Sequence, residues 1–298
     1  MSYLPSLKQL KYLCAVAEHR HFGHAAKACH VSQSTLSAGI QELESQLSAG
    51  LIERNNKQVM MTPLGEDICS QAQRILLAVD DLMASCEVRS APLSGSLRLG
   101  VIPTIAPYIL PKLLNRLRRS YPRLRVFIRE EMSRPLTDAL QNGELDVLLL
   151  ALPFPANGVE VMPLFDDPFV LAAPRGHPLT AASSVPIEAL RGSELLLLED
   201  GHCLRDHALD ACKLNPRDLR VPYQATSLTT IVQMVANGIG ITLLPQMAVD
   251  AKILHGTRIQ TRPFAEQEIT RHIGLMWRGT SPRQAEYRML GDFIKAGD

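Results

Sequence analysis

Two cysteines, Cys203 and Cys212, stand nine positions apart in a segment rich in groups that act on thiols. His202 precedes Cys203, and Arg205 follows it within one helical turn. Positive neighbours and a helix N-terminus both favour the thiolate, which is the form that attacks a peroxide. Attack gives a sulfenic acid, which a second thiol converts to a disulfide. Cys212 is the only cysteine near enough in sequence to be that second thiol.

Helix geometry sets a condition on this pair. If residues 204–213 are helical, a rise of 1.5 Å per residue places the two cysteines roughly 13 Å apart. A disulfide needs Cα atoms within about 7 Å. Helix and disulfide therefore exclude each other, and oxidation has to unwind the segment, as a two-state switch requires.

Two other interpretations of these cysteines stay open. The spacing alone also fits two ordinary core cysteines. A zinc site would draw on His202, Cys203, His207 and Cys212, although their spacing matches no familiar tetrahedral motif. Packing on apolar helix faces explains the other four cysteines, which are Cys14, Cys29, Cys69 and Cys86.

Strands and helices alternate after residue 96 and must position this segment. Apolar runs predict strands at 97–101, 126–128, 147–151, 169–173, 195–198, 241–244 and 273–277. Helical patterns fall at 109–120, 135–141, from about 204, and at 227–236. This order predicts a parallel sheet covered by helices, in one large or two small α/β lobes.

The first 60 residues carry a helix-turn-helix pattern. Helices are expected at 7–17 and 24–29, followed by a turn and a helix whose apolar residues are spaced four, three and four apart. The start of that last helix would meet base edges in the major groove, so the candidate readers are Gln33, Ser34, Thr35 and Ser37. A polar hairpin then predicts a wing, with Arg54 and Lys57 against phosphates. The alternative is a helical hairpin that only packs.

A long helix follows, with apolar residues at heptad spacing. They are Ile68, Ala72, Ile75, Val79, Leu82 and Cys86. The pattern predicts a seam that dimerises two chains, and the alternative is a helix packed on its own domain. We expect a DNA-binding domain at 1–62, a dimerising linker helix at 63–90 and a regulatory domain at 91–298.

Composition limits the function classes. The chain has 298 residues, 46% of them hydrophobic, and a net charge of +1, which excludes a disordered or uniformly basic protein. Residues 1–60 hold six Lys and Arg against four acids, so DNA binding would need several copies of the chain. No secretion signal or membrane span is evident, and a cytoplasmic location is expected. Common enzyme motifs are absent, which argues against an enzyme and leaves a thiol peroxidase as the enzyme alternative.

Nearly the whole chain resembles the LysR-type transcriptional regulators. The matching motifs are Phe22–Ala26, Val31–Ser37, Leu51–Arg54 and Thr62–Gly65. The motif Leu198–Asp206, with Cys212 after it, is similar to the peroxide-sensing subgroup of that family. Two positions depart from the family pattern: Cys29 replaces a leucine, and Ser48 replaces a glycine after the recognition helix.

The resemblance implies an all-α winged helix-turn-helix DNA-binding domain plus linker helix, joined to an α/β periplasmic-binding-protein-like two-lobed regulatory domain. It implies a peroxidatic Cys203 and a resolving Cys212, surrounded by Thr104, Ser133, His202 and Arg271, with no cofactor or metal. A surface position for Arg271 is the alternative.

The implied partners are promoter operators in double-stranded DNA, hydrogen peroxide, RNA polymerase, and glutaredoxin-type or thioredoxin-type thiol reductants. The implied assembly is a homodimer or homotetramer. A second possibility within the family is a regulator that binds a small effector in the cleft between its lobes, through Thr104 and Ser227.

Overall fold

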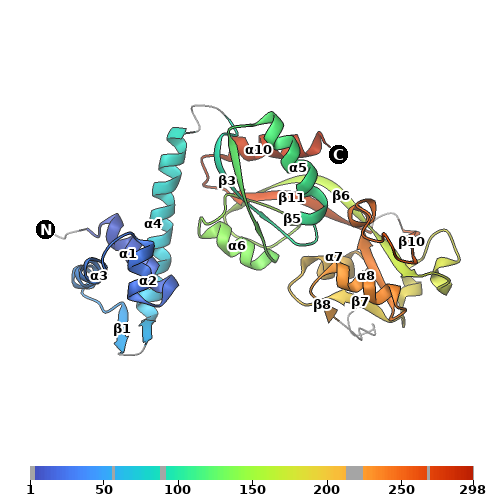
Figure 1. Cartoon of the computed structure of the whole chain (residues 1–298), viewed down its shortest axis with the longest axis horizontal. Helices are drawn as coiled ribbons and strands as arrows, with labels where there is room; N and C mark the ends of the chain where they lie inside the picture. Colours follow the sequence, from blue (N-terminus) through green and yellow to red (C-terminus); the bar gives the residue numbers. More distant parts are fainter. Residues whose placement is uncertain (1–3, 56–57, 88–91, 213–223, 267–268, 298) are drawn as a thin grey trace. The chain divides into compact units, whose positions relative to one another are not determined.

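The computed structural model describes residues 4–55, 58–87, 92–212, 224–266 and 269–297 (Figure 1). The chain divides into two compact units, Met1–Arg89 and Ser90–Asp298, and each is described by itself. Over the described residues, none of the helices combines enough length with enough apolar character to span a bilayer.

The N-terminal unit has the predicted helix-turn-helix and wing. Its elements are α1 (Leu7–His19), α2 (Phe22–Ala28), α3 (Gln33–Leu47), β1 (Ile52–Asn55), β2 (Gln58–Met61) and α4 (Pro63–Glu87). The wing strands pair antiparallel. Ser48, which stands where the family has glycine, adopts a left-handed conformation at φ 51° and ends α3. The turn is therefore kept without the glycine.

The first turns of helix α4 pack on the rest of the N-terminal unit, and apolar residues further along the helix are exposed. Thr62 Oγ1 accepts from the Gly65 amide at 2.9 Å and donates to the Gly50 carbonyl, which fixes the helix start. A Cβ at position 65 would overlap the Leu51 carbonyl, so glycine is required there. Ala72 is buried in the core of its own unit, whereas Ile75 and Leu82 are exposed. The early part of the heptad pattern therefore packs in the domain core, whereas its later residues are exposed to solvent.

The second unit is built on one curled sheet of two lobes. The strands are β3 (Gly95–Val101), β4 (Leu124–Glu130), β5 (Val147–Leu152), β6 (Val159–Pro174), β7 (Leu195–Leu198), β8 (Gln224–Ala225), β9 (Ile241–Pro245), β10 (Ile259–Pro263) and β11 (Thr270–Arg278). The helices are α5 (Ala106–Ser120), α6 (Ser133–Gln141), α7 (Cys203–Ala211), α8 (Leu228–Ala236), α9 (Gln246–Asp250) and α10 (Gln284–Lys295), with 3-10 turns at Pro178–Thr180 and Ile187–Leu190. The strand order is β4-β3-β5-β11-β6-β9-β7-β8, with β10 on β6.

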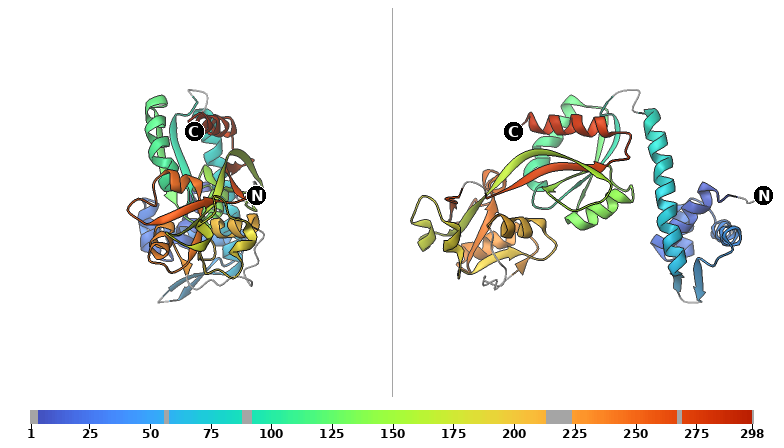
Figure 2. Two further views of the ribbon diagram at one scale, coloured as in Figure 1. Left: turned by 90° about the vertical axis from the view of Figure 1, so that its right-hand side faces the viewer. Right: turned by 180° about the vertical axis from the view of Figure 1, so that it is seen from behind.

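The sheet is mixed, and the prediction of a parallel sheet was wrong in this respect. Strands β3, β4 and β5 are parallel to one another, as are β7, β8 and β9. Strands β6 and β11 run antiparallel to each other and to their neighbours β5 and β9. These two long strands pass from one lobe to the other (Figure 2). Through these strands the chain crosses between the lobes, and the local sequence pattern did not predict this crossing.

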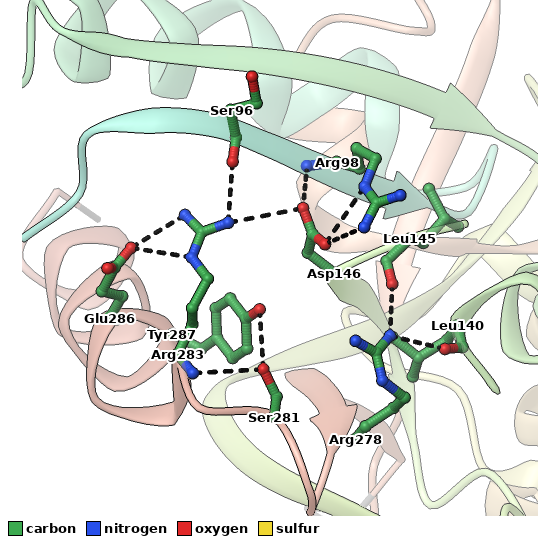
Figure 3. Close-up of polar contacts among 10 residues, drawn as sticks. All are labelled: Ser96, Arg98, Leu140, Leu145, Asp146, Arg278, Ser281, Arg283, Glu286 and Tyr287. Carbon is green, nitrogen blue, oxygen red and sulfur yellow. Dashed lines mark hydrogen bonds and ion pairs between the residues drawn. The ribbon is translucent and has the colours of Figure 1, made fainter. Parts of the chain in front are cut away.

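Each lobe has its own apolar core. The first lobe core centres on β3, β5 and β11, and the second lobe core on β6, β7 and β9 with α8. Helix α10, which was not predicted, is tied to the first lobe by a polar cluster (Figure 3). There Arg283 bonds the Ser96 carbonyl at 2.8 Å and pairs with Asp146 and Glu286.

Candidate functional site: a buried thiol between two lobes

The loop before α7 delivers Cys203 to the first turn of that helix. Strand β7 ends at Leu198, and Gly201 turns the chain at φ +97°, a conformation that favours glycine. A Cβ at Gly201 would lie 3.3 Å from Met132 Sδ. The loop therefore lies against the residue that precedes α6, and glycine permits this close approach.

Helix α7 begins in one core and ends in the other. Cys203 is 7% exposed and packs in the first lobe core. Cys212 is 1% exposed, ends the helix and packs in the second lobe core. Both thiols are free, and the nine-residue helix between them holds the sulfurs in separate cores. Burial raises the pKa of the Cys212 thiol to about 12.

The expected stabilisation of the Cys203 thiolate was wrong in its sign. Burial raises the pKa of the Cys203 thiol, and the Ser133 hydroxyl, the Arg271 charge and the Ala151 backbone offset this only in part. Arg205, which the sequence placed beside the thiol, pairs instead with Asp200. Burial of Cys203 thus disfavours its thiolate.

Arg271 is buried and is not a surface residue. It lies in β11, is 1% exposed, and donates from Nη1 to Thr104 Oγ1 and from Nη2 to the Thr104 carbonyl, both at 3.0 Å. A guanidinium has no acceptor atom, so the Thr104 hydroxyl oxygen accepts the hydrogen bond. The proton of the Thr104 hydroxyl therefore points away from Arg271. Because the Arg271 charge also lowers the pKa of the Cys203 thiol, Arg271 connects Thr104 with Cys203.

Asp167 is a site residue that the sequence did not single out. It stands opposite Arg271 on the neighbouring strand β6, and Arg271 Nε donates to Asp167 Oδ2 at 2.9 Å. Asp167 Oδ1 accepts from the Met247 amide at 2.9 Å, which ties the pair to α9. Burial raises the pKa of Asp167, and the Arg271 charge opposes this. The ion pair fixes the guanidinium that holds Thr104.

Ser133 begins α6 and is buried, with 1% of its surface exposed. Its hydroxyl lies near enough to the Cys203 thiol to lower the pKa of that thiol, and it has no hydrogen-bond partner within the described residues. The hydroxyl is therefore available at the sulfur for a further partner.

Two histidines flank this site. His202 is buried and precedes α7 without capping it through its side chain, and burial lowers its imidazole pKa. His207 Nε2 lies 3.3 Å from the Pro153 carbonyl, a contact between α7 and the segment after β5. Burial is also the main cause of the lowered pKa of His207. Burial therefore disfavours the charged form of both rings.

The predicted DNA readers stand at the exposed start of α3. Ser32 caps the helix by accepting from the Thr35 amide at 3.1 Å, and its hydroxyl also contacts Ser34 and Thr35. Gln33 is exposed, and Ser37 is half-buried. Arg54 lies in β1, but its side chain and the whole of Lys57 lie outside the described residues.

Two observations bear on the zinc and effector alternatives. No cluster of three or more His, Cys, Asp or Glu side chains suited to a metal occurs in the described part of the chain. A cavity of about 530 Å³ is lined by Tyr108, Lys112, Phe165, Met247 and others, but by neither Thr104 nor Ser227. Ser227 Oγ instead caps α8 through the Thr230 amide.

Comparison with known proteins identifies the family. Residues 7–66 match the family described as bacterial regulatory helix-turn-helix protein, lysR family, and residues 90–298 match the LysR substrate binding domain. The chain belongs to the LysR family of transcriptional regulators.

Individual relatives narrow this assignment to the OxyR group. A probable hydrogen peroxide-inducible genes activator from Streptomyces viridosporus is 44% identical over 292 residues, covering 98% of this chain and 94% of the relative. The regulator EstR from Acinetobacter baylyi is 39% identical, covering 99% and 98%. A full-length OxyR variant from Pseudomonas aeruginosa matches with a TM-score of 0.81 at 38% identity, covering 98% of this chain and 95% of that one. Within the LysR family this chain stands with OxyR.

Proposed function

We propose that this LysR-family protein is a hydrogen-peroxide-sensing DNA-binding regulator whose sensor is the pair Cys203 and Cys212. The observation that carries the proposal is their arrangement: two free, buried thiols stand at opposite ends of one short helix. That helix and a disulfide cannot exist together. Peroxide would therefore select between two shapes of the segment.

The first chemical step is attack of the Cys203 thiolate on one peroxide oxygen. The S–O bond forms, the O–O bond breaks, and the departing hydroxide takes a proton to leave as water. Thr104 suits the donor role because Arg271 donates to its oxygen and leaves its own proton for the peroxide. We assign Ser133 and His202 to holding the peroxide beside the sulfur.

The second step joins the two thiols. The Cys212 sulfur attacks the sulfenic sulfur of Cys203, and water leaves as the disulfide forms. For the sulfurs to meet, α7 has to unwind and withdraw at least one cysteine from its lobe core. A dithiol of the thioredoxin or glutaredoxin type returns two electrons and resets the segment.

The output is a change in DNA contacts. We propose that two copies dimerise through the exposed part of α4, where Ile75 and Leu82 lie, and that dimers assemble into a tetramer on promoter DNA. Gln33, Ser34, Thr35 and Ser37 then read base edges, and Arg54 and Lys57 contact phosphates. The refolded segment alters the pairing of regulatory units. This changes how the assembly acts with RNA polymerase, and so changes transcription of peroxide-defence genes. We propose that the protein acts in the cytoplasm.

Thiol mapping tests the proposal. Reduced protein is treated with a few equivalents of hydrogen peroxide, alkylated and digested. We expect loss of the Cys203 and Cys212 thiols and a peptide linking these two residues. Cys203→Ser should abolish the loss of the Cys212 thiol, Cys212→Ser should leave a sulfenic acid on Cys203, and Cys29→Ser is the matched control. Retention of both thiols would refute sensing by this pair.

Two further measurements separate the alternatives. A thiol peroxidase would sustain turnover of peroxide with a dithiol reductant after deletion of residues 1–62, whereas a sensor reacts once for each slow reset. An effector-binding regulator would respond to a small carboxylate with both cysteines replaced. We expect neither result, and we expect operator binding in both redox states.

A further inference from the structure

The N-terminal unit contains a second pair of cysteines in contact. Cys14 lies in α1 and Cys69 in α4, and these two helices pack on each other. Cys14 Sγ lies 3.9 Å from the Cys69 carbonyl oxygen, so the two residues are adjacent, and each shifts the pKa of the other. Cys69 is 6% exposed, and Cys14 is half-buried. The packing that the sequence suggested for both cysteines therefore also brings the Cys14 sulfur against Cys69.

The surroundings give the two sulfurs different chemistry. The interaction with Cys14 lowers the pKa of Cys69, and the nearby charge of Arg20 adds to this against the effect of burial. The same contact, with burial, raises the pKa of Cys14. Arg20 is held next to the pair by its ion pair with Glu66 at 3.5 Å. These shifts favour ionisation of Cys69 over that of Cys14.

We propose that Cys14 and Cys69 form a second oxidisable dithiol, located in the DNA-binding unit and independent of Cys203 and Cys212. The Cys69 thiolate attacks a peroxide oxygen, the O–O bond breaks, and hydroxide leaves as water after taking a proton. Cys14 sulfur then attacks the sulfenic sulfur of Cys69, the S–S bond forms, and the Cys14 proton leaves with the second water. The peroxide gains the two electrons that the thiols lose.

The consequence is a covalent tie between α1 and α4. The two cysteines are adjacent across packed helices, so joining them does not require a helix to unwind, unlike Cys203 and Cys212. The product stiffens the helix-turn-helix unit against α4, the helix that leads toward the regulatory unit. We therefore expect oxidation here to protect the DNA-binding unit from local unfolding, with no refolded segment.

The test uses the full chain with Cys203→Ser and Cys212→Ser, so that failure of the regulatory pair cannot affect it. Protein treated with hydrogen peroxide is alkylated, digested and mapped, and amide exchange is followed in α1 and α4. We expect loss of two thiols, a peptide linking Cys14 to Cys69, and at least tenfold slower exchange in both helices. Adding Cys69→Ser should prevent the loss, whereas Cys29→Ser should not.

Circular dichroism of each variant shows whether the unit remains folded, and Cys69→Ala serves as a second variant if the serine variant does not. Thiols that stay fully alkylatable at a large excess of peroxide would overturn the proposal. A cross-link from Cys14 to Cys29 instead of Cys69 would overturn it equally.

Discussion

Burial raises the pKa of the Cys203 thiol above its ordinary value of 9.0. A thiol below its pKa gains thiolate tenfold for each pH unit, and only the thiolate attacks peroxide. The rate of Cys203 oxidation in the Cys212→Ser variant should therefore climb between about pH 6 and about pH 9 and level off only above that. Stopped-flow measurement of sulfenic acid formation checks this. A plateau already reached at neutral pH would show that the thiolate is stabilised in the resting protein.

Asp167 holds Arg271 in place, so replacing Asp167 should slow the oxidation of Cys203. Asp167→Asn keeps the side-chain shape but leaves the buried guanidinium without its negative partner, which costs about 3 kcal/mol of unfolding free energy. We expect Cys203 oxidation to slow by about tenfold, because ~1.4 kcal/mol of transition-state positioning is lost. Thermal unfolding and peroxide kinetics check the two effects.

The neighbouring Asp166 supplies the control for this variant. Its ion pair with His272 is exposed, so Asp166→Asn should change the unfolding free energy by less than about 1 kcal/mol. Its oxidation rate should match that of the unmodified chain. Equal rates in both variants would mean that Asp167 has only a structural role.

At the scale of elements, the loop between β7 and α7 depends on Gly201. Gly201→Ala forces a side chain into a left-handed conformation, at a cost of about 1 kcal/mol, and also brings its Cβ against Met132. We expect slower Cys203 oxidation, since the loop aligns the cysteine with Ser133. Gly238→Ala has the same backbone penalty at φ +78° with open space around the Cβ. It should lose similar stability and keep the oxidation rate, and a slowed Gly238 variant would show that strain alone is responsible.

Short apolar runs and caps were enough to predict most elements. Ser32 before α3, Ser227 before α8 and the apolar run of β7 follow local rules, and the structure has these elements where the sequence indicated them. Strand β6 was predicted only from Phe169 because Pro163 and Pro168 interrupt its earlier part. That part exists through pairing with β11, which is far away in sequence.

The candidate site could also be predicted from the sequence only where local motifs mark its residues. Family motifs led to Cys203, Thr104, Ser133 and Arg271, but Asp167 has no local signal beside Asp166. Its role follows from strand register, which sets it opposite Arg271 across 104 positions of sequence. The raised pKa of Cys203 likewise depends on its burial in the first lobe core, and the charged residues near it in sequence give no indication of that burial.

At the scale of the whole molecule, the exposed part of α4 should hold two chains together. Leu82 and Met83 are equally exposed, at 65% and 64%, but only Leu82 continues the heptad pattern. Leu82→Glu should weaken dimerisation at least tenfold, or ~1.4 kcal/mol, because a charge would enter the seam. Met83→Glu should leave it unchanged. Sedimentation equilibrium compares the two, and equal dissociation constants would place the dimer interface elsewhere.

The most direct test of the account follows α7 itself during oxidation. Amide hydrogen exchange of residues 203–212 is measured in the thiol form and in protein whose Cys203–Cys212 cross-link has been confirmed by peptide mapping. The account predicts protected amides in the thiol form and rapid exchange throughout α7 once the disulfide is present. A cross-linked protein in which α7 stays as protected as before would contradict it, because the sensor would then have formed its bond without changing shape.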